Sequence, residues 1–390
     1  MIGRKLVFVV TEDWYFWSHR LPSARAALAL GYEVALVTRP GRFADAIRAE
    51  GIAVHPWPVI RGGTRFLSEL RAIVSLFAIL RRLRPDVIHN VALKPVVYGT
   101  IAGKLAGISD IVNSVTGLGF FFASKKRRAR LAGAALLLVL RRLARLRRTI
   151  TICQNEDDAG LIFSGREGRE TGLRLIRGSG VDIRHFTPMP EPGGVPVAAL
   201  VARMLWEKGV GDLVAAAAIL KERHPGLLRI VLVGAVDREN PGAIFEETLK
   251  AWQENGLVEW WGPSSDIVSV WRRAHIAVLP SFREGLPKAL LEAAACGRPI
   301  VTTDVPGCRE TVEEGVNGFL VPLHDAEALA TALYRLAVDP ELRERMGQAG
   351  RARAVSYFSD EVVSEQLTAV YREIGARPRR GQAKQRPRRG

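Results

Sequence analysis

IAVLPSFREGLPKALLEAAACG, residues 276–297, is the stretch of this chain that decides its fold. The apolar run at 276–280 predicts a buried strand. Residues 287–296 predict a helix with a proline in its first turn and a glycine just past its end. Glu284 then lies in the strand-to-helix turn, and Glu292 lies about two turns along the helix. The free N–H groups of a helix N-terminus bind anions, so this turn is a candidate anion site beside two carboxylates. A polyhydroxylated ligand that carries phosphate would suit both features, whereas a solvated pair of glutamates on an amphipathic helix would show the same spacing.

Apolar strands and helical segments alternate along both halves of the chain. Strands are expected at 6–10, 33–38, 52–57, 87–89 and 111–115, and then at 196–201, 228–233, 258–261, 276–280, 299–303 and 319–321. Such alternation is typical of parallel sheets covered by helices on both faces. We therefore expect the α/β class, with two doubly wound domains over 1–187 and 188–358, a helix over 359–375 and a tail over 376–390.

Length and composition agree with two globular domains. A chain of 390 residues is too long for one ordinary hydrophobic core, and its 48% hydrophobic and 25% charged residues are typical of globular proteins. The cysteines Cys153, Cys296 and Cys308 lack metal-ligand spacing and cannot all pair, which indicates structural thiols in a reducing compartment. The N-terminal apolar run is too brief for a signal peptide, and no apolar run reaches the roughly 18–20 residues that span a bilayer.

The net charge of +16 is concentrated in two segments. Residues 125–148 carry ten basic and no acidic side chains, and residues 376–390 carry seven basic and no acidic ones, so the rest of the chain is close to neutral. A neutral body argues against a protein built throughout to bind nucleic acid, and we expect no nucleic-acid partner. The tail at 376–390 is rich in proline, glutamine and arginine, and we expect it to be disordered.

The basic segment at 125–148 encloses ten mostly apolar residues, 131–140. This run is too short to cross a bilayer, but a segment lying flat, with its arginines at the phosphate head groups, would anchor the N-terminal domain. We therefore expect 125–148 to contact an anionic membrane surface, with 376–390 as a second electrostatic contact. The alternative is an ordinary buried helix with charged ends.

Two basic residues follow the expected strand at 196–201. Arg203 and Lys208 flank the turn into the next helix. A forked guanidinium and a compact ammonium at the end of a strand suit a diphosphate, although isolated surface cations would have the same sequence. Because the carboxyl ends of parallel strands share one edge, these cations and Glu284 are expected at the edge where ligands of such sheets bind.

The combined motifs resemble the retaining GT-B glycosyltransferases of family 4, also called group 1. The resemblance covers most of residues 175–375. It implies two Rossmann-like domains that face a cleft, with the acceptor bound by the N-terminal domain and a nucleotide sugar bound by the C-terminal domain. It also implies a C-terminal helix that packs back toward the N-terminal domain. The motifs that carry it are Arg203 with Lys208-Gly209, Glu284 and Glu292 with seven residues between them, ACGRPIV (295–301), EGVNGFLV (314–321) and GSGVDIRHFTP (178–188), in which Ser179 stands where the family usually has Asn.

The resemblance assigns a role to each matching residue. Arg203 and Lys208 hold the nucleotide diphosphate and neutralise its charge as it leaves, and with Glu284, which contacts the donor sugar, they form the expected catalytic set. Glu292 accepts hydrogen bonds from the ribose hydroxyls. Members of the family need no metal and no cofactor, and this sequence contains no Asp-x-Asp motif. The other expected donor-site positions are Gly234, Gly262, Gly285 and Leu286.

An aromatic loop expected at 11–20 resembles a subgroup of the family that acts on lipid-linked saccharides. The candidates on this acceptor side are Ser18, His19, His89 and Thr116, and at the position of Thr116 the family often has His. For His19 and His89, a purely structural role is the open alternative.

We therefore predict a retaining, metal-independent glycosyltransferase. It would move a hexose or N-acetylhexosamine from a nucleotide diphosphate sugar, expected to be UDP-linked, to a lipid-linked saccharide during surface polysaccharide or glycan synthesis. The expected location is the cytoplasmic face of the cell membrane, as a peripheral protein. One alternative is another sugar-nucleotide enzyme of the same fold, such as a UDP-N-acetylglucosamine 2-epimerase. The other is a non-catalytic protein that binds membranes or nucleic acid through its basic segments.

Overall fold

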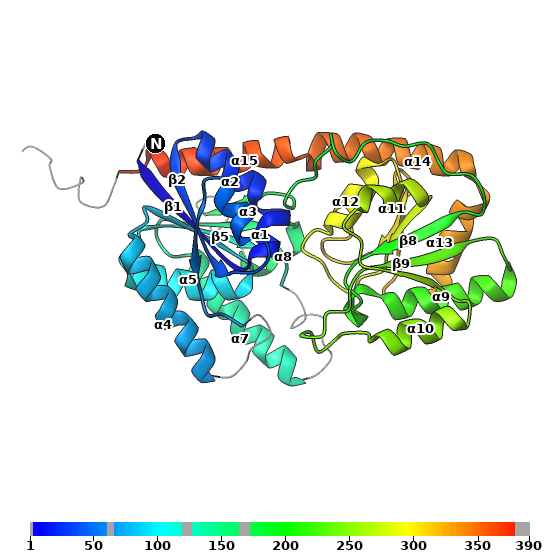
Figure 1. Cartoon of the computed structure of the whole chain (residues 1–390), viewed down its shortest axis with the longest axis horizontal. Helices are drawn as coiled ribbons and strands as arrows, with labels where there is room; N and C mark the ends of the chain where they lie inside the picture. Colours follow the sequence, from blue (N-terminus) through cyan, green and yellow to red (C-terminus); the bar gives the residue numbers. More distant parts are fainter. Residues whose placement is uncertain (1–2, 61–65, 119–126, 164–171, 379–390) are drawn as a thin grey trace, which may run out of the picture. The chain divides into compact units, whose positions relative to one another are not determined.

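Two compact units make up this chain, seen in a computed structural model that describes residues 3–60, 66–118, 127–163 and 172–378 (Figure 1). The chain leaves the first unit after Ser179, before the expected boundary at residue 187, and its C-terminal part belongs to the first unit again. Of the described residues, those up to 179 and those from 363 to 378 belong to unit 1, and residues 180–362 form unit 2.

Unit 1 is built on a seven-stranded parallel sheet with the strand order β3-β2-β1-β4-β5-β6-β7. All five strands expected from the sequence of this unit are present. The last two strands are additional, and β7 has only three residues, too few for an alternating pattern to identify it. The strands are β1 (Arg4–Glu12), β2 (Tyr32–Arg39), β3 (Ala53–Pro56), β4 (Val87–Val91), β5 (Asp110–Val115), β6 (Thr149–Cys153) and β7 (Leu173–Leu175).

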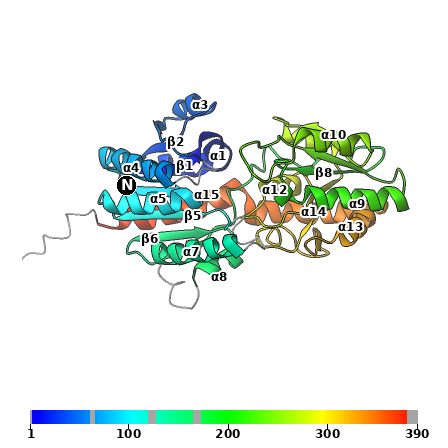
Figure 2. The same ribbon diagram turned by 90° about the horizontal axis from the view of Figure 1, so that it is seen from below.

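Helices cover both faces of the unit 1 sheet. The strand β1 directs Leu6 and Phe8 into one apolar cluster and Val7 and Val9 into another, so both of its faces are buried and it is apolar throughout. Helices α4, α5 and α7 lie side by side on one face (Figures 1 and 2). The helices are α1 (Asp13–His19), α2 (Leu21–Ala29), α3 (Ala44–Ala49), α4 (Phe66–Leu83), α5 (Leu93–Leu105), α7 (Arg127–Ala144) and α8 (Glu156–Ile162).

Residues 13–19, within the loop that the sequence predicted at 11–20, form helix α1, and residues 11 and 12 end strand β1. Helix α1 begins directly after β1. Asp13 is 2% exposed and accepts hydrogen bonds from the N–H groups of Gly41 (2.6 Å) and Phe43 (3.0 Å). This buried carboxylate fixes the first turn of α1 to the loop after β2. The loop prediction was wrong because the contact joins residues that are far apart in the sequence.

Unit 2 is built on a six-stranded parallel sheet with the strand order β10-β9-β8-β11-β12-β13. All six strands expected here are present: β8 (Val197–Val201), β9 (Arg229–Val233), β10 (Glu259–Gly262), β11 (Ile276–Leu279), β12 (Ile300–Thr303) and β13 (Gly318–Val321). The helices are α9 (Val210–Arg223), α10 (Glu246–Glu254), α11 (Ile267–Arg273), α12 (Lys288–Ala295), α13 (Ala326–Val338) and α14 (Pro340–Arg353), with a 3-10 turn η2 (Trp206–Lys208) and a π-helical turn η3 (Ala354–Phe358).

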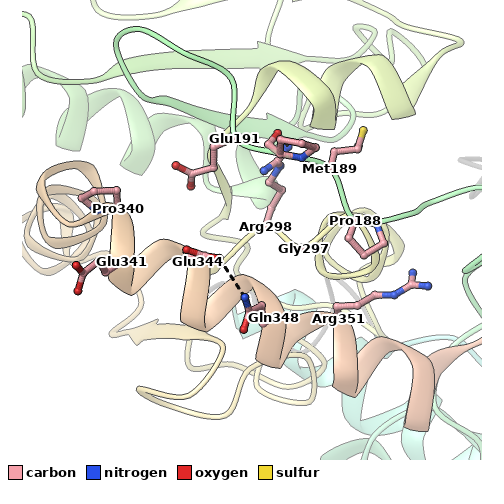
Figure 3. Close-up of a pocket in the computed structure, with 11 residues that line it drawn as sticks. Pro188, Met189, Glu191, Gly297, Arg298, Pro340, Glu341, Glu344, Gln348 and Arg351 are labelled. Carbon is pink, nitrogen blue, oxygen red and sulfur yellow. Dashed lines mark hydrogen bonds between the residues drawn. The ribbon is translucent and has the colours of Figure 1, made fainter.

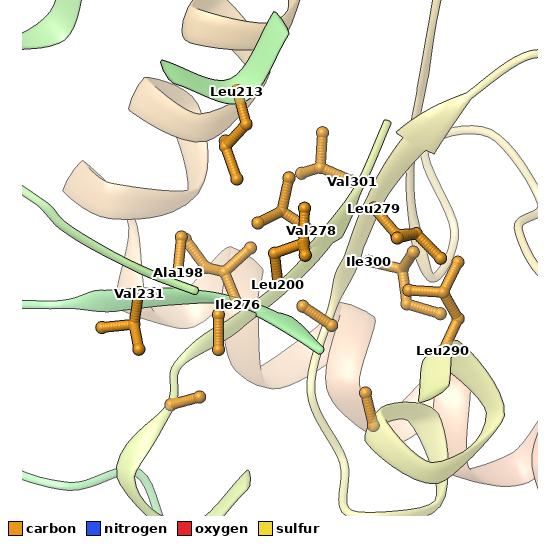
Figure 4. Close-up of a cluster of buried hydrophobic side chains, with 14 of the residues drawn as sticks. Ala198, Leu200, Leu213, Val231, Ile276, Val278, Leu279, Leu290, Ile300 and Val301 are labelled. Carbon is orange, nitrogen blue, oxygen red and sulfur yellow. The ribbon is translucent and has the colours of Figure 1, made fainter. Parts of the chain in front are cut away.

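One continuous apolar core holds unit 2 together. The central strands β8 and β11 contribute Ala198, Leu200, Ile276 and Val278, which pack against residues of the neighbouring strands and helices (Figure 4). The opening stretch of the sequence thus folds as expected, with β11 in the core and α12 after the turn. All three cysteines are free and buried, as structural thiols should be.

The C-terminal helix α15 (Asp360–Ala376) packs on unit 1, as the family resemblance implied. Its residues Val363, Leu367, Val370, Tyr371 and Ile374 belong to the same apolar cluster as Leu6 and Phe8 of β1. Arg377 forms ion pairs with Asp110 (3.2 Å) and Glu373 (2.8 Å). The disorder expected for 376–390 is therefore wrong for its first residues, 376–378, and residues 379–390 lie outside the described part of the chain.

Candidate active site

The strand order of unit 2 creates a topological switch point between β8 and β11. From β8 the chain proceeds to β9 and β10 on one side, and from β11 it proceeds to β12 and β13 on the other. Loops that diverge at such a point leave room for a ligand beyond the carboxyl ends of the two strands. Arg203 and Lys208 follow β8, and Glu284 follows β11. The structure therefore places these three residues at the switch point of the sheet.

Lys208 and Glu284 are in direct contact. The Lys208 ammonium donates a hydrogen bond of 2.5 Å to Oε1 of Glu284, and the Ser281 hydroxyl donates a second one of 2.7 Å to the same oxygen. The side chains are 18% and 13% exposed, so the ion pair is shielded from bulk water without being closed off. No other hydrogen bond to the Glu284 carboxylate occurs among the described residues, so Oε2 has no hydrogen-bond donor from that part of the chain.

Lys208 is positioned by close contact between the backbones of two loops, the one after β8 and the one after β11. The turn η2 ends at Gly209, whose φ of +71° lies in the left-handed region that glycine adopts without strain. A Cβ at this position would lie 1.9 Å from the carbonyl oxygen of Pro280. The N–H of Phe282 also donates to the carbonyl of Glu207 (2.9 Å). The loops after β8 and β11 are therefore joined backbone to backbone, which fixes where the ammonium of Lys208 can reach.

The segment after β12 packs against the turn that carries Glu284 and forms a hydrogen bond with it. The Glu284 N–H donates to the carbonyl of Pro306 (3.1 Å). Gly307 packs so closely against this turn that a Cβ on it would lie 2.4 Å from the Glu284 carbonyl oxygen. The Thr303 hydroxyl donates to the carbonyl of Ser281. These contacts hold the carboxylate in place, and the buried Gly285 and half-buried Leu286 follow it just before α12.

Arg203 has a partner that the sequence motifs did not indicate. One nitrogen of its guanidinium, Nη1, donates a hydrogen bond to Asp237 in an ion pair. Asp237 lies in the loop after β9. The signal for it in the sequence is weak, because a lone Asp four residues past a strand is common in surface turns.

Gly234 and Gly262 meet at the same edge of the sheet. The N–H of Gly234 donates to the carbonyl of Gly262 (2.9 Å), and the indole N–H of Trp260 donates to the carbonyl of Gly234 (3.1 Å). A Cβ on Gly234 would lie 1.7 Å from the carbonyl oxygen of Ala202. Glycine is therefore required where the loops after β8, β9 and β10 converge, next to Arg203.

Glu292 lies within helix α12, after the turn that carries Glu284. Helix α12 starts at Lys288, so Glu292 is little more than one turn along it, closer to the helix start than the sequence predicted. Burial raises the pKa of Glu292 to about 7, and the charge of Asp360 adds to the rise while that of Lys288 opposes it. Burial likewise raises the pKa of Asp360 to about 6. Glu292 is thus a carboxyl group that changes its charge close to neutral pH.

The unit 1 sheet has its own switch point, between β1 and β4. Ser18 and His19 lie at the end of α1, directly after β1, where the hydroxyl of Ser18 is 2.6 Å from Nδ1 of His19. The ring of His19 stacks on Tyr15 with 4.3 Å between ring centroids. Thr116 is half-buried and follows β5. Ser18 and His19 thus lie one short helix beyond the carboxyl end of β1, and Thr116 follows the carboxyl end of β5.

His89 belongs to the core of unit 1 and is removed from the acceptor-side candidates. Its side chain is completely buried, Nδ1 is 2.7 Å from the hydroxyl of Tyr371, and Nε2 is 2.7 Å from the hydroxyl of Ser114. Burial lowers the pKa of His89 well below its usual value, with a further contribution from the charge of Arg20. A neutral ring with both nitrogens engaged has a structural role.

Family models match both halves of the chain. A model described as Glycosyl transferase 4-like matches residues 5–155, and one described as Glycosyl transferases group 1 matches residues 195–339. The chain belongs to the group 1 glycosyltransferases.

Curated relatives of this glycosyltransferase cover nearly its whole length. It is 27% identical to the N,N'-diacetylbacillosaminyl-diphospho-undecaprenol alpha-1,3-N-acetylgalactosaminyltransferase of Campylobacter jejuni, over 91% of this chain and 95% of the relative. It is 26% identical to the UDP-Gal:alpha-D-GlcNAc-diphosphoundecaprenol alpha-1,3-galactosyltransferase of Escherichia coli, over 81% of each chain. Among solved structures, the sucrose-phosphate synthase of Thermosynechococcus elongatus aligns with a TM-score of 0.79 at 19% identity, over 96% of this chain and 99% of that one. That likeness shows the two-domain GT-B architecture.

The glycosyltransferase has a pocket in unit 2 that is lined by α14 and by the segments that lead into β8 and β12 (Figure 3). Its cations serve the fold. Arg298 donates to the carbonyls of Trp271 and Pro190, each at 3.0 Å, and Arg351 donates to the carbonyl of Phe186 at 2.7 Å. Arg298 thus ties the segment that leads into β8 to the loop before β12, and Arg351 ties it to α14. The lining residues are Pro188, Met189, Pro190, Glu191, Gly297, Arg298, Pro340, Glu341, Glu344, Gln348 and Arg351.

Residues 127–144 of the basic segment of the glycosyltransferase form helix α7, which has both buried and exposed apolar side chains. Leu140 and Ala144 are buried, whereas Leu131 and Leu138 are 72% and 55% exposed. The alternative of an ordinary buried helix is therefore wrong for the described residues. The segment is also less unbalanced than expected, because Arg148 forms an ion pair with Asp110. Among the helices of the described residues, none is long and apolar enough to cross a membrane.

Proposed function

We propose that this glycosyltransferase moves a hexose or N-acetylhexosamine from a nucleotide diphosphate sugar, linked to UDP, to a lipid-diphosphate-linked saccharide. The transfer retains the anomeric configuration of the donor and uses no metal ion. The observation that carries the proposal is the ion pair of Lys208 and Glu284 at the switch point of the unit 2 sheet, with Arg203 on the same loop as Lys208.

The charges at this site suit the chemistry of glycosyl transfer. The bond from C1 of the donor sugar to a diphosphate oxygen breaks, a bond from C1 to an acceptor hydroxyl forms, and the hydroxyl proton is released. Negative charge develops on the leaving diphosphate, where Lys208 and Arg203 would stabilise it. Oε2 of Glu284, without a protein donor among the described residues, remains to accept a hydrogen bond from a sugar hydroxyl.

Two relatives support the choice of substrates. The name of the Escherichia coli relative gives UDP-Gal as its donor, which supports a UDP-linked donor here. The names of both relatives specify acceptors on diphosphoundecaprenol, and their alignments cover 91% and 81% of this chain. We infer from them that the acceptor is a saccharide on a lipid diphosphate, made for a surface polysaccharide or glycan.

A lipid-linked acceptor requires unit 1 to work at a bilayer, and one helical layer of unit 1 suits that surface. Helix α7 exposes apolar side chains next to arginines, and α4 adds an exposed stripe of Leu67, Leu70 and Val74, spaced three and four residues apart on one helix face. We propose peripheral binding to the cytoplasmic face of an anionic membrane through 125–148, with 376–390 as a second contact.

The test begins with the donor. Thermal unfolding of the protein is followed with UDP, GDP, ADP and dTDP sugars, because a ligand that binds the native state raises the melting temperature. We expect stabilisation by a UDP-sugar. That sugar is then incubated with lipid-diphosphate-linked saccharides in the presence of EDTA, and the product is identified by mass spectrometry and its anomeric configuration by NMR.

The same assay separates the alternatives. Formation of a longer lipid-linked saccharide with the anomeric configuration of the donor is the expected result. Conversion of the donor without an added acceptor would favour a sugar-nucleotide epimerase. Stabilisation by none of the nucleotide sugars would contradict the proposed function, and loss of activity in EDTA would contradict metal independence alone.

A further inference from the structure

Arg203 has one edge of its guanidinium engaged and one edge free. Nη1 binds Asp237, whereas Nε and Nη2 form no hydrogen bond to any described residue. The side chain is 32% exposed, so this Nε–Nη2 edge is open to a ligand. Two parallel N–H groups on one guanidinium edge match two oxygens of a phosphate, which is the geometry of a bidentate contact.

The loop that carries Asp237 is built onto the loop that carries Arg203. The N–H of Met204 donates to the carbonyl of Ala235 (3.0 Å), and the N–H of Ile244 donates back to the carbonyl of Met204 (2.9 Å). The N–H of Trp206 donates to the carbonyl of Gly242 (2.9 Å). Since these bonds bracket both residues, the backbone that carries Asp237 is held in place relative to the backbone that carries Arg203.

The Asp237 loop is also braced within itself. The N–H of Asn240 donates to the carbonyl of Asp237 (2.9 Å), and the side-chain oxygen of Asn240 accepts from the N–H of Gly242 (2.9 Å). Asp237 is 17% exposed, less than Arg203. The carboxylate is thus the fixed member of the pair, and the long arginine side chain is oriented by it.

We propose that Asp237 is a positioning residue that orients Arg203, so that its Nε–Nη2 edge meets the diphosphate of the donor. This inference rests on the proposed function of the same site. A negative charge beside a diphosphate also repels it, and the two effects of Asp237 have opposite signs. Orientation strengthens diphosphate binding, whereas repulsion weakens it, so the direction of change in an Asp237 variant decides between them.

The test is calorimetric titration of the full chain with UDP. Asp237→Asn keeps the size of the side chain and removes the charge. If Asp237 orients Arg203, the Kd for UDP rises about tenfold, within the range of measured couplings between contacting charged groups. Asp237→Glu retains a carboxylate and is expected to restore part of the affinity. Asp304→Asn is the matched control, because Asp304 lies at the same edge of the sheet and pairs with Arg309.

An Arg203→Lys background separates positioning from a general structural effect. Lysine has no forked edge, so Asp237→Asn should cause no further loss of UDP affinity in that background. An equal loss in both backgrounds, or unchanged or tighter binding of UDP by Asp237→Asn alone, would overturn the positioning role while leaving the proposed function in place. A wild-type protein that binds neither UDP nor another nucleoside diphosphate would overturn both.

Discussion

Lys208 and Glu284 act on one another through a single carboxylate oxygen. Oε1 of Glu284 accepts from both Lys208 and Ser281, so removing the ammonium leaves a partly buried carboxylate with only a hydroxyl donor. Residues coupled in this way lose function together, and their effects on the rate are not additive.

We expect Lys208→Ala and Glu284→Gln each to reduce the transfer rate by about 100-fold or more, the usual effect of removing one electrostatic contact to a transition state. The double variant should be little slower than either single one. Initial rates of sugar transfer measure this, with the melting temperature as a check on folding. Lys221→Ala and Glu222→Gln, at exposed positions on α9, are the matched controls. Full activity in both site variants would refute the site assignment.

The raised pKa of Glu292 predicts a dependence of ligand binding on pH. A carboxylate accepts ribose hydroxyls better than a neutral carboxyl does, so the affinity for UDP should rise as the pH increases through about 7 and then level off. Calorimetry between pH 6 and pH 8 measures the trend. Glu292→Gln should bind UDP more weakly and without this slope, and a slope that persists in the variant would assign the titration to another group.

The raised pKa of Glu292 also affects the stability of the fold, which should fall with rising pH whereas the affinity for UDP should increase. The folded-state pKa of about 7 lies above the ordinary value of 4.5, so the native state binds more protons than the unfolded state between these two values. The contribution of Glu292 to the free energy of unfolding therefore falls as the pH rises from 4.5 to about 7. Glu292→Gln should flatten this part of the stability profile.

At the residue scale, the sequence was sufficient for positions whose chemistry follows from a strand end. Arg203, Lys208 and Glu284 come directly after apolar strands, and parallel strands bring such residues to one edge. The partners of Asp237 and His89 could not be predicted from the sequence. The partner of Asp237 comes from another loop, and the hydroxyl that binds Nδ1 of His89 comes from Tyr371, near the C-terminus.

At the scale of the element, α7 combines two features that are separate in most surface helices. It exposes large apolar side chains, and exposed arginines lie at Arg142, Arg145 and Arg147 around its C-terminal end. Apolar burial in the interface and attraction to anionic head groups add to one another at a membrane surface.

Replacing Arg142, Arg145 and Arg147 by Gln should weaken sedimentation with anionic liposomes on the order of 100-fold, at about 1 kcal/mol for each cation. Pelleting assays over a range of salt concentrations measure this, and the wild-type signal should fall as the salt concentration rises. The matched control replaces Arg272, Arg345 and Arg372, which are exposed on other elements. Equal pelleting of the two triple variants would exclude a specific role for the α7 region.

The exposed apolar stripe of α4 allows a second test, of membrane binding that does not depend on the salt concentration. Leu67→Ser with Leu70→Ser removes exposed apolar surface from the same layer without touching a charge. We expect weaker pelleting at high salt, where electrostatic attraction is screened. Unchanged pelleting at high salt would leave α7 as the membrane contact and remove α4 from it.

Elements differ in how far the sequence predicts them. Helix α4 (Phe66–Leu83) carries a strong local signal, because its apolar residues recur on one face over several turns. Helix α1 escaped prediction because it is short and its first turn depends on the tertiary contact of Asp13 with the loop after β2. Short elements held by distant partners carry little local signal.

At the scale of the whole molecule, the C-terminal helix completes a core that begins with the first strand. Tyr371 is fully buried, its hydroxyl contacts His89, and its carbonyl accepts from the hydroxyl of Tyr32. Residues more than 300 positions apart in the chain are thus neighbours in unit 1.

Tyr371→Ala should destabilise unit 1 by about 3–5 kcal/mol, the usual effect of deleting a buried aromatic side chain. Tyr371→Phe keeps the ring and removes only the contact with His89, so its effect should be about 1 kcal/mol. Calorimetric unfolding measures both, with the exposed neighbour Arg372→Ala as the control. An unchanged unfolding transition in Tyr371→Ala would mean that α15 contributes nothing to the core of unit 1.

Local patterns in the sequence are enough to predict the α/β class, the two doubly wound sheets, and the residues that meet at the carboxyl edge of the second sheet. These features follow from local rules, because apolar periodicity sets the elements and parallel topology gathers the strand ends. Which charges pair becomes clear in the folded structure alone, where Lys208 pairs with Glu284 and Arg203 with Asp237. The same is true of the burial of His89 in the core and of the raised pKa of Glu292. Pairing and burial depend on distances between segments remote in the chain, and such distances exist only once the chain has folded.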